Sequence, residues 1–203
     1  MTGVKQRFYG YAAMGASPTI QKRMRAVLAN AGGYRKAGGC TTTAFVLAGL
    51  TSFDPWVEFP LETIVEFLIA HVNSGMKVAN EQAWKQKLPD MQKGARWSRV
   101  YGSLSAAMAS LIDAGFEVPS IHHWIDPSGG EWCLDFSEPM FTPAVREVLQ
   151  HFLTLGVWGR AQNHVFGSSL GLRPDLRPGK SRIRQAKKQQ KWQELYFLEA
   201  IMQ

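Results

Sequence analysis

The stretch PLETIVEFLIAHVNSG, residues 60–75, decides the fold class. Its apolar residues recur at the three- and four-residue spacing of one helix face: Leu61, Ile64, Val65, Leu68 and Val72. Pro60 suits the first turn of a helix, and Gly75 is typical of the residue that ends one. The stretch therefore predicts an amphipathic helix, with Glu62 and Glu66 one turn apart on a different, solvated face.

A similar pattern lies nearer the N-terminus. Ser17 and Pro18 supply the N-cap and first-turn residues of a helix that ends at residues 32–33, both glycine. Its apolar stripe is expected to consist of Ile20, Met24, Val27, Leu28 and Ala31. Three bases lie off that stripe and are expected in solvent: Lys22, Arg23 and Arg25.

Four further segments favour helices, although residues 80–94 are polar and fit a loop as well. The segment from Arg96 to Ala114 predicts one long helix, with the core stripe Trp97, Val100, Leu104, Met108 and Leu111. Its small residues leave another side thin enough for a close neighbour: Gly102, Ser103, Ala106, Ala107 and Ser110. Thr142 and Pro143 begin a helix that should end at Gly156, with Val145, Val148, Leu149, Phe152 and Leu155 inward. A last helix is expected over residues 180–203.

One segment favours β-structure. IHHWI (121–125) and EWCLDF (131–136) flank the turn-rich DPSGG, which predicts a hairpin over about residues 121–136. Its inward side chains are expected to be Trp124, Trp132, Leu134 and Phe136. The predicted fold class is mainly α, a helical bundle with one β-hairpin and basic N- and C-terminal arms.

Three segments are expected along the chain: a basic N-terminal arm with one short helix (1–39), a helical core domain with the hairpin (40–172), and a basic C-terminal segment and helix (173–203). The 203 residues are 45% hydrophobic, which is enough for a sizeable core. No apolar run is long enough to span a bilayer, so no membrane partner is expected. Two cysteines and no secretory signal favour a reducing, intracellular setting or the interior of a virus particle, with mitochondrial import of residues 1–31 as an alternative.

Charge is segregated along the chain. Residues 1–53 hold seven bases and no acid, and residues 173–203 hold eight bases and three acids. Residues 54–172 hold eight bases and thirteen acids. Basic ends favour a polyanionic partner such as nucleic acid, or docking onto the acidic middle of a neighbouring copy.

The basic ends supply the candidate binding residues. The nucleic-acid-binding residues are predicted to be Lys5, Arg7, Tyr9, Lys22, Arg25, Arg35, Lys36, Arg173, Arg177, Lys180, Arg182, Arg184, Lys187, Lys188 and Lys191. Near the N-terminus, bases alternate with aromatic side chains, which can stack on the bases of a single strand. In the last helix four bases share one face at i, i+4, i+7 and i+11. No base-reading motif is present, so we expect sequence-tolerant contact with RNA or DNA phosphates.

Catalytic motifs are mostly rejected. RPGKS (177–181) lacks the earlier glycine of a phosphate-binding loop, because Pro174 stands in its place. The best metal or nuclease candidate is His122 and His123 with Asp126, Cys133 and Asp135, but adjacent strand residues face opposite sides, and a structural hairpin explains the same residues. His71, His151 and His164 are isolated in sequence and favour packing or surface roles. We expect no catalytic residues, metal or cofactor.

Three blocks resemble the helical core-binding domain of tyrosine recombinases: PWVEFPLETIVEFLIAHVNSG, RWSRVYGSLSAAMASLIDAGFEVPS and KSRIRQAKK. The resemblance covers about half of the chain and implies a DNA-binding module. The hairpin departs from that pattern, and we expect no domain with the catalytic arginine, histidine and tyrosine in these 203 residues.

The preferred hypothesis is a non-enzymatic structural protein, nucleocapsid- or coat-like, that binds nucleic-acid backbone and forms a homo-oligomer. The alternatives are the recombinase module, a subunit of a ribonucleoprotein or other large assembly, and a metal-dependent nuclease.

Overall fold

A computed structural model describes residues 10–33, 41–42, 45, 53–136 and 141–162. Within them are six α-helices, one 3-10 helix and one two-stranded antiparallel sheet, which confirms the mainly helical class. The chain divides into two compact units, Met1–Lys22 with Pro55–Leu153 and Arg23–Asp54 with Thr154–Gln203. None of the helices in the described ranges is long and apolar enough to cross a bilayer.

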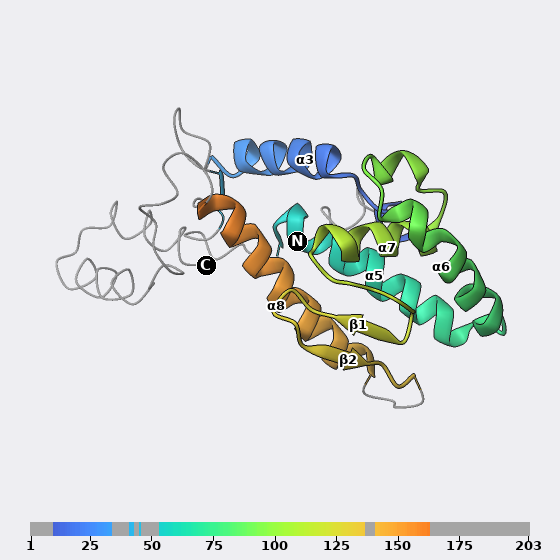
Figure 1. Cartoon of the computed structure of the whole chain (residues 1–203). Coiled ribbons are helices and arrows are strands. Elements are labelled where there is room, and N and C mark those ends of the chain that lie inside the picture. Colours follow the sequence, from blue (N-terminus) through green and yellow to red (C-terminus); the bar gives the residue numbers. More distant parts are fainter. Residues whose placement is uncertain (1–9, 34–40, 43–44, 46–52, 137–140, 163–203) are drawn as a thin grey trace. The chain divides into compact units, whose positions relative to one another are not determined.

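The first unit is built around α5 (Pro55–Asn73). This helix contacts α2 (Tyr11–Met14), α6 (Lys77–Met91) and α7 (Ser103–Asp113), and α7 also lies against α6 (Figure 1). Eleven of the nineteen residues of α5 are buried. A helix that is apolar on most of its circumference gains stability only when neighbours cover it, and the surrounding helices do this.

The start of α5 differs from the prediction. The helix begins at Pro55, and Pro60, expected to open it, lies inside the second turn. Proline there removes one backbone hydrogen bond. Burial of the apolar side chains around it offsets that loss, at about 1.5–3 kcal/mol for each large aliphatic side chain. Glu66 is exposed, as expected, whereas Glu62 is half-buried.

The predicted long helix from Arg96 to Ala114 is interrupted. Residues Arg96–Arg99 form the 3-10 helix η2, Val100 is extended, and Gly102 has φ 142°. Helix α7 then begins at Ser103 and buries small side chains, including Ala106, Ala107 and Ser110. The expectation of a side thin enough for a close neighbour is thus confirmed, because these residues let the α2 segment approach α7 closely.

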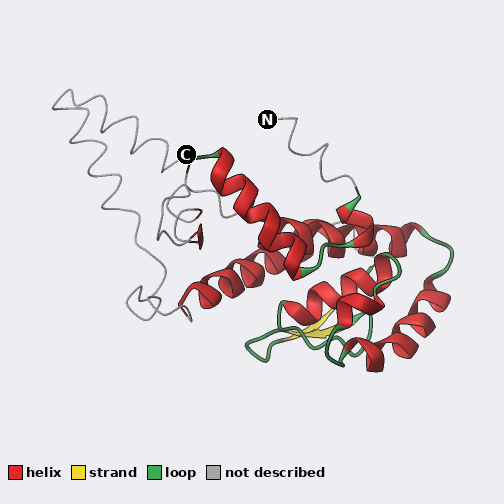
Figure 2. Ribbon diagram, turned by 90° about the horizontal axis from the view of Figure 1, so that it is seen from above, coloured by secondary structure: helices red, strands yellow, loops and turns green. Residues whose placement is uncertain are grey.

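The hairpin forms where it was predicted. Strands β1 (His123–Ile125) and β2 (Glu131–Cys133), yellow in Figure 2, pair with Trp124 opposite Trp132. Trp124 is buried, but Trp132 is 37% exposed, so the prediction that both point inward is wrong. The Trp132 indole instead donates a hydrogen bond to the Asp126 carboxylate.

Two helices differ from the predicted pattern of burial. In α3 (Pro18–Ala31) the buried residues are Gln21, Arg25 and Ala29, whereas Val27 of the predicted stripe is 56% exposed. Helix α8 (Phe141–Gln162) begins one residue before Thr142 and continues past Gly156. Leu155, expected inward, is 50% exposed, and Leu153 is buried instead. Residues 1–9 and 34–39 of the N-terminal arm, and the whole C-terminal segment 173–203 with its predicted helix, lie outside the described residues.

We predict that Gly15→Ala destabilises the first unit. Gly15 has φ 70°, and a Cβ there would lie 2.9 Å from the Ala106 Cβ and 3.0 Å from the Trp97 ring. Gly33→Ala is the control, because Gly33 has φ 69° and no atom of the described residues lies within 4 Å of the added Cβ. Overpacking should make Gly15→Ala more costly than the control by about 1–3 kcal/mol. Urea unfolding monitored by tryptophan fluorescence measures the difference, and equal costs would refute the close packing.

Candidate functional site

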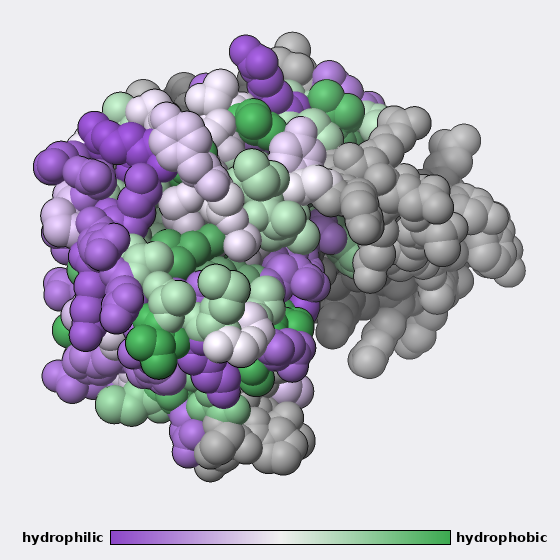
Figure 3. Space-filling view, turned by 90° about the vertical axis from the view of Figure 1, so that its right-hand side faces the viewer, coloured by the Kyte–Doolittle hydropathy of each residue, from purple (hydrophilic) through white to green (hydrophobic). Residues whose placement is uncertain are grey.

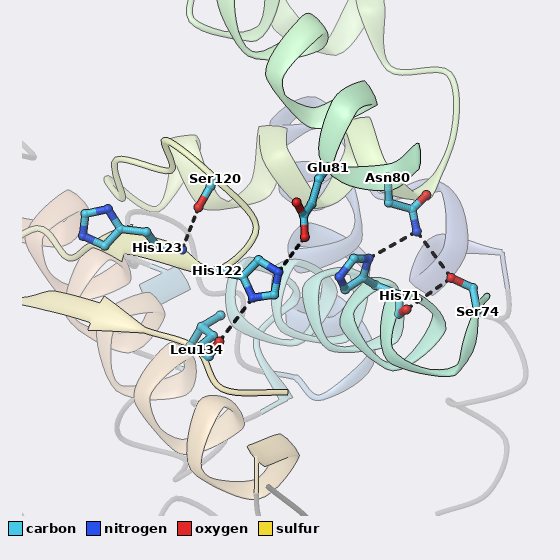
Figure 4. Close-up of polar contacts among 8 residues, drawn as sticks. All are labelled: His71, Ser74, Asn80, Glu81, Ser120, His122, His123 and Leu134. Atoms are coloured by element: carbon cyan, nitrogen blue, oxygen red, sulfur yellow. Dashed lines mark hydrogen bonds and ion pairs between the residues drawn. The ribbon is translucent and has the colours of Figure 1, made fainter. Parts of the chain in front are cut away.

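The described residues bring two histidines and one glutamate together in the first unit. His71 lies in the last turn of α5, Glu81 lies in the first half of α6, and His122 directly precedes β1 (Figure 4). Each residue offers one nitrogen or oxygen atom, and these three atoms lie within 4.8 Å of one another. We call this group the His71 cluster.

His71 is the buried member, with 1% of its surface exposed. Its Nδ1 lies 3.2 Å from Nδ2 of Asn80, while Nε2 is buried and has no hydrogen-bond partner among the described residues. A buried polar atom without a partner costs about 1–3 kcal/mol. Burial lowers the pKa of His71 below 6.5, and the neighbouring His122 lowers this pKa further. The imidazole is therefore neutral at neutral pH.

His122 and Glu81 form the solvent side of the cluster. Nε2 of His122 lies 2.8 Å from Oε1 of Glu81, and Nδ1 lies 3.3 Å from the carbonyl oxygen of Leu134. Their side chains are 43% and 39% exposed. The Glu81 carboxylate and the Leu134 carbonyl are both hydrogen-bond acceptors. His122 can therefore donate to both of them only when both of its ring nitrogens carry hydrogen.

Aromatic rings surround the histidines. The His71 ring centroid lies 5.3 Å from that of Phe136, 6.1 Å from that of Phe67 and 6.0 Å from that of His122. Trp84 is buried, stacks on Phe67 with ring centroids 5.8 Å apart and donates from Nε1 to the carbonyl oxygen of Val118 at 2.9 Å. This apolar frame fixes the segment on which His122 lies relative to α6.

The hairpin loop holds the other end of that segment. The Asp126 carboxylate accepts hydrogen bonds from the backbone N–H and the hydroxyl of Ser128, the N–H of Gly130 and the Trp132 indole. The hydrogen bonds from Ser128, followed by the one from Trp132, lower the pKa of Asp126 from 3.8 to about 2. Asp126 therefore organises the turn, and both of its carboxylate oxygens accept hydrogen bonds from the residues of the hairpin.

The five residues that the sequence suggested as a metal site do not come together in the structure. His122 and His123 face different ways, as expected (Figure 4), and His123 lies 3.4 Å from Glu131 instead. Cys133 is exposed and lies opposite His123 in the strand register. Of the five residues proposed there, the structure places only His122 in the His71 cluster.

Sequence reasoning missed His71 and Glu81, because they lie on two different helices, far from His122 along the chain. One signal was available for His71. It follows Leu61, Ile64 and Leu68 at helical spacing, which places a histidine on the buried face of the helix. No comparable signal exists for Glu81, since an acid on a polar helix is normally a solvated residue.

Two predicted nucleic-acid-binding residues lie within the described ranges. Lys22 is exposed, whereas Arg25 is 5% exposed, so the expectation that Arg25 is solvated is wrong. Its Nε lies 2.7 Å from Oδ1 of Asp54, and its Nη2 donates to Oδ2 of Asp54 at 2.7 Å and to the Thr42 hydroxyl at 2.9 Å. A guanidinium held in this way supports the second unit and is not available to phosphate.

The other thirteen predicted residues lie outside the described ranges: Lys5, Arg7, Tyr9, Arg35, Lys36, Arg173, Arg177, Lys180, Arg182, Arg184, Lys187, Lys188 and Lys191.

A hollow of about 610 Å³ in the first unit is lined by Glu58, Glu62 and Glu66 together with Tyr11 and Phe67. Arg146 donates to both carboxylate oxygens of Glu62, at 2.6 and 3.2 Å. These hydrogen bonds raise the pKa of Arg146. Glu62 is thus paired across to Arg146 of α8.

No family model, curated protein or solved structure matches the chain.

We predict that Asp54→Asn strongly destabilises the protein, because it leaves the buried Arg25 guanidinium without its counter-charge. The expected loss is about 3–5 kcal/mol of unfolding free energy. Arg23→Ala removes an exposed arginine two positions away and should change stability by at most about 0.5 kcal/mol. Chemical unfolding curves test both variants, and a small effect of Asp54→Asn would contradict a buried ion pair.

We also predict acid sensitivity of the hairpin loop. Because the folded-state pKa of Asp126 is about 2, below its ordinary 3.8, the ionised carboxylate stabilises the fold above pH 4. That stabilisation should be lost as the pH falls from about 4 to about 2. Thermal unfolding across this range should be less pH-dependent in Asp126→Asn than in the natural protein. Identical pH profiles would show that these hydrogen bonds do not act on the carboxylate.

Proposed function

We propose that this protein binds the phosphate backbone of RNA or DNA through its basic terminal segments and assembles with copies of itself. The observation that carries the proposal is the charge distribution: residues 1–53 and 173–203 are strongly basic, and residues 54–172 are acidic. Protein segments with this excess of cations favour association with a polyanion.

In the described middle of the chain, bases and acids pair with one another, which supports assigning phosphate binding to the terminal segments. There, several bases are engaged by acids of the same unit: Arg96 with Asp113, Arg146 with Glu62, and Lys93 with Asp90. Charge in this unit thus contributes to local structure. The terminal segments have many more bases than acids, so counter-charge for them is best supplied by a partner.

Surface features of the first unit support self-association. The face shown in Figure 3 has apolar side chains interspersed among hydrophilic ones. Met76, Val78 and Tyr101 are 63%, 69% and 81% exposed. These exposed apolar side chains are available for contacts with a neighbouring copy, since the fully buried core of an interface is mainly apolar. A packaging protein of the nucleocapsid or coat kind would combine such contacts with basic ends.

We predict that the full chain, purified without nuclease, carries nucleic acid at low salt and releases it at high salt. Neutralisation of four to six phosphates gives a log–log salt slope of about −3 to −5. Absorbance ratios and size-exclusion chromatography at both salt concentrations test co-purification and multimer formation. Fluorescence anisotropy with unrelated RNA and DNA oligonucleotides then gives the slope.

A charge-matched pair of variants locates the binding surface. Replacing Lys180, Arg184, Lys187 and Lys191 by glutamine should weaken binding by at least about tenfold at 0.1 M salt. The control replaces four lysines of the middle segment by glutamine: Lys77, Lys85, Lys87 and Lys93. Equal losses in the two variants would count against the basic ends, and a preference for a palindromic site would favour a recombinase-like module.

A further inference from the structure

We propose that His71, Glu81 and His122 bind one divalent transition-metal ion of the zinc class. The proposal is independent of nucleic-acid binding, because none of these residues belongs to the basic segments. It also departs from the sequence-based expectation that the protein has no metal site.

The donor set suits such an ion. Two imidazole nitrogens and one carboxylate oxygen are ligands that Zn²⁺ prefers, and three protein ligands leave a fourth position for water. Zinc bonds of about 2.0–2.1 Å in a tetrahedral site separate neighbouring ligand atoms by about 3.3 Å. The three atoms now lie within 4.8 Å of one another, so small side-chain rotations bring them to this spacing.

The unpartnered nitrogen of His71 points to the ligand. Nε2 is buried without a hydrogen-bond partner among the described residues, and in Figure 4 the rings of His71 and His122 are turned toward each other beneath Glu81. A metal ion between them would satisfy Nε2 and remove the cost of leaving it unpaired. Hydrogen bonds within the cluster account for His122 and Glu81 but leave this atom unexplained.

Outer contacts are in place for both histidines. Metal-bound histidines usually donate their second N–H to a carbonyl or carboxylate. Nδ1 of His122 faces the Leu134 carbonyl at 3.3 Å. Nδ1 of His71 faces the Asn80 amide at 3.2 Å, and a half-turn of that amide presents its oxygen as the acceptor. Each ring would then direct Nε2 at the ion.

The cluster is open to an ion from solvent on one side, and it holds a proton that the ion would replace. Glu81 and His122 are partly exposed, so an ion can enter from solvent, while His71 closes the inner side. On binding, the proton on Nε2 of His122 leaves to solvent and the metal takes the lone pair. The bound ion would connect α5, α6 and the start of the hairpin, and should therefore stabilise their packing.

The test uses the full chain, stripped with EDTA and dialysed, with Cys133→Ser introduced to remove the exposed thiol. Isothermal titration with ZnCl₂ should give one ion per chain. At a free zinc concentration a hundredfold above Kd, the unfolding temperature should rise by about 5–10 °C. Titration with CoCl₂ should give visible absorption bands of a tetrahedral nitrogen–oxygen site.

Two variants test the ligands without creating a cavity in the core. Glu81→Gln and His122→Asn change partly exposed side chains, and each should weaken zinc binding at least about tenfold. Circular dichroism without zinc confirms that both variants fold. The matched control is His123→Ala with Glu131→Gln, which removes the other histidine–glutamate pair of the same region and should leave zinc affinity unchanged.

The proposal is overturned if the Cys133→Ser protein shows no saturable zinc binding tighter than about 10 μM. It is also overturned if Glu81→Gln and His122→Asn bind zinc as the parent does, or if the control double variant loses binding. In those cases the cluster is an aromatic and hydrogen-bonded part of the core.

Discussion

The burial of α5 is the constraint on which the first unit depends. Its buried residues are spread over most of the helix circumference, from Val57 to His71, so no single neighbour can cover them. Helices α2, α6 and α7 each cover a part, and α7 can approach closely because it presents alanine and serine. Since burial of each large aliphatic side chain contributes about 1.5–3 kcal/mol, this arrangement supplies much of the stability of the unit.

The same burial creates the chemistry of the His71 cluster. A histidine on the inner face of α5 must lose most of its hydration, which lowers its pKa and leaves one ring nitrogen without a partner among the described residues. The neighbouring α6 and hairpin segment then decide which groups it meets. Trp84, which donates to the Val118 carbonyl, and the turn organised by Asp126 help to hold the segments that carry Glu81 and His122.

Charge has two different roles in this chain. Arg25 shows why a basic residue cannot be assigned to a phosphate surface from sequence alone. It lies off the apolar stripe of α3, yet Asp54 and Thr42 hold it in the interior of the second unit. The unequal numbers of bases and acids in the terminal segments are a property of composition and do not depend on such placement.

The sequence by itself determined the mainly helical class, the hairpin and the approximate extent of most helices. Helical periodicity, capping residues and turn residues are local signals, and they need no knowledge of neighbours in space. The predicted helix boundaries were wrong at Pro60, where the helix begins earlier, and at Arg99, where the predicted long helix is broken. Packing can outweigh one lost hydrogen bond in the first case, and a glycine with positive φ redirects the chain in the second.

Only the tertiary structure decided which polar residues face inward and which meet. The burial of Arg25, the exposure of Trp132 and the pairing of Glu62 with Arg146 all depend on contacts between segments distant in sequence. The His71 cluster is the clearest case, because its three members come from two helices and a strand entrance. Periodicity records which face of a helix is apolar, but the identity of the group opposite that face is set by how the chain packs.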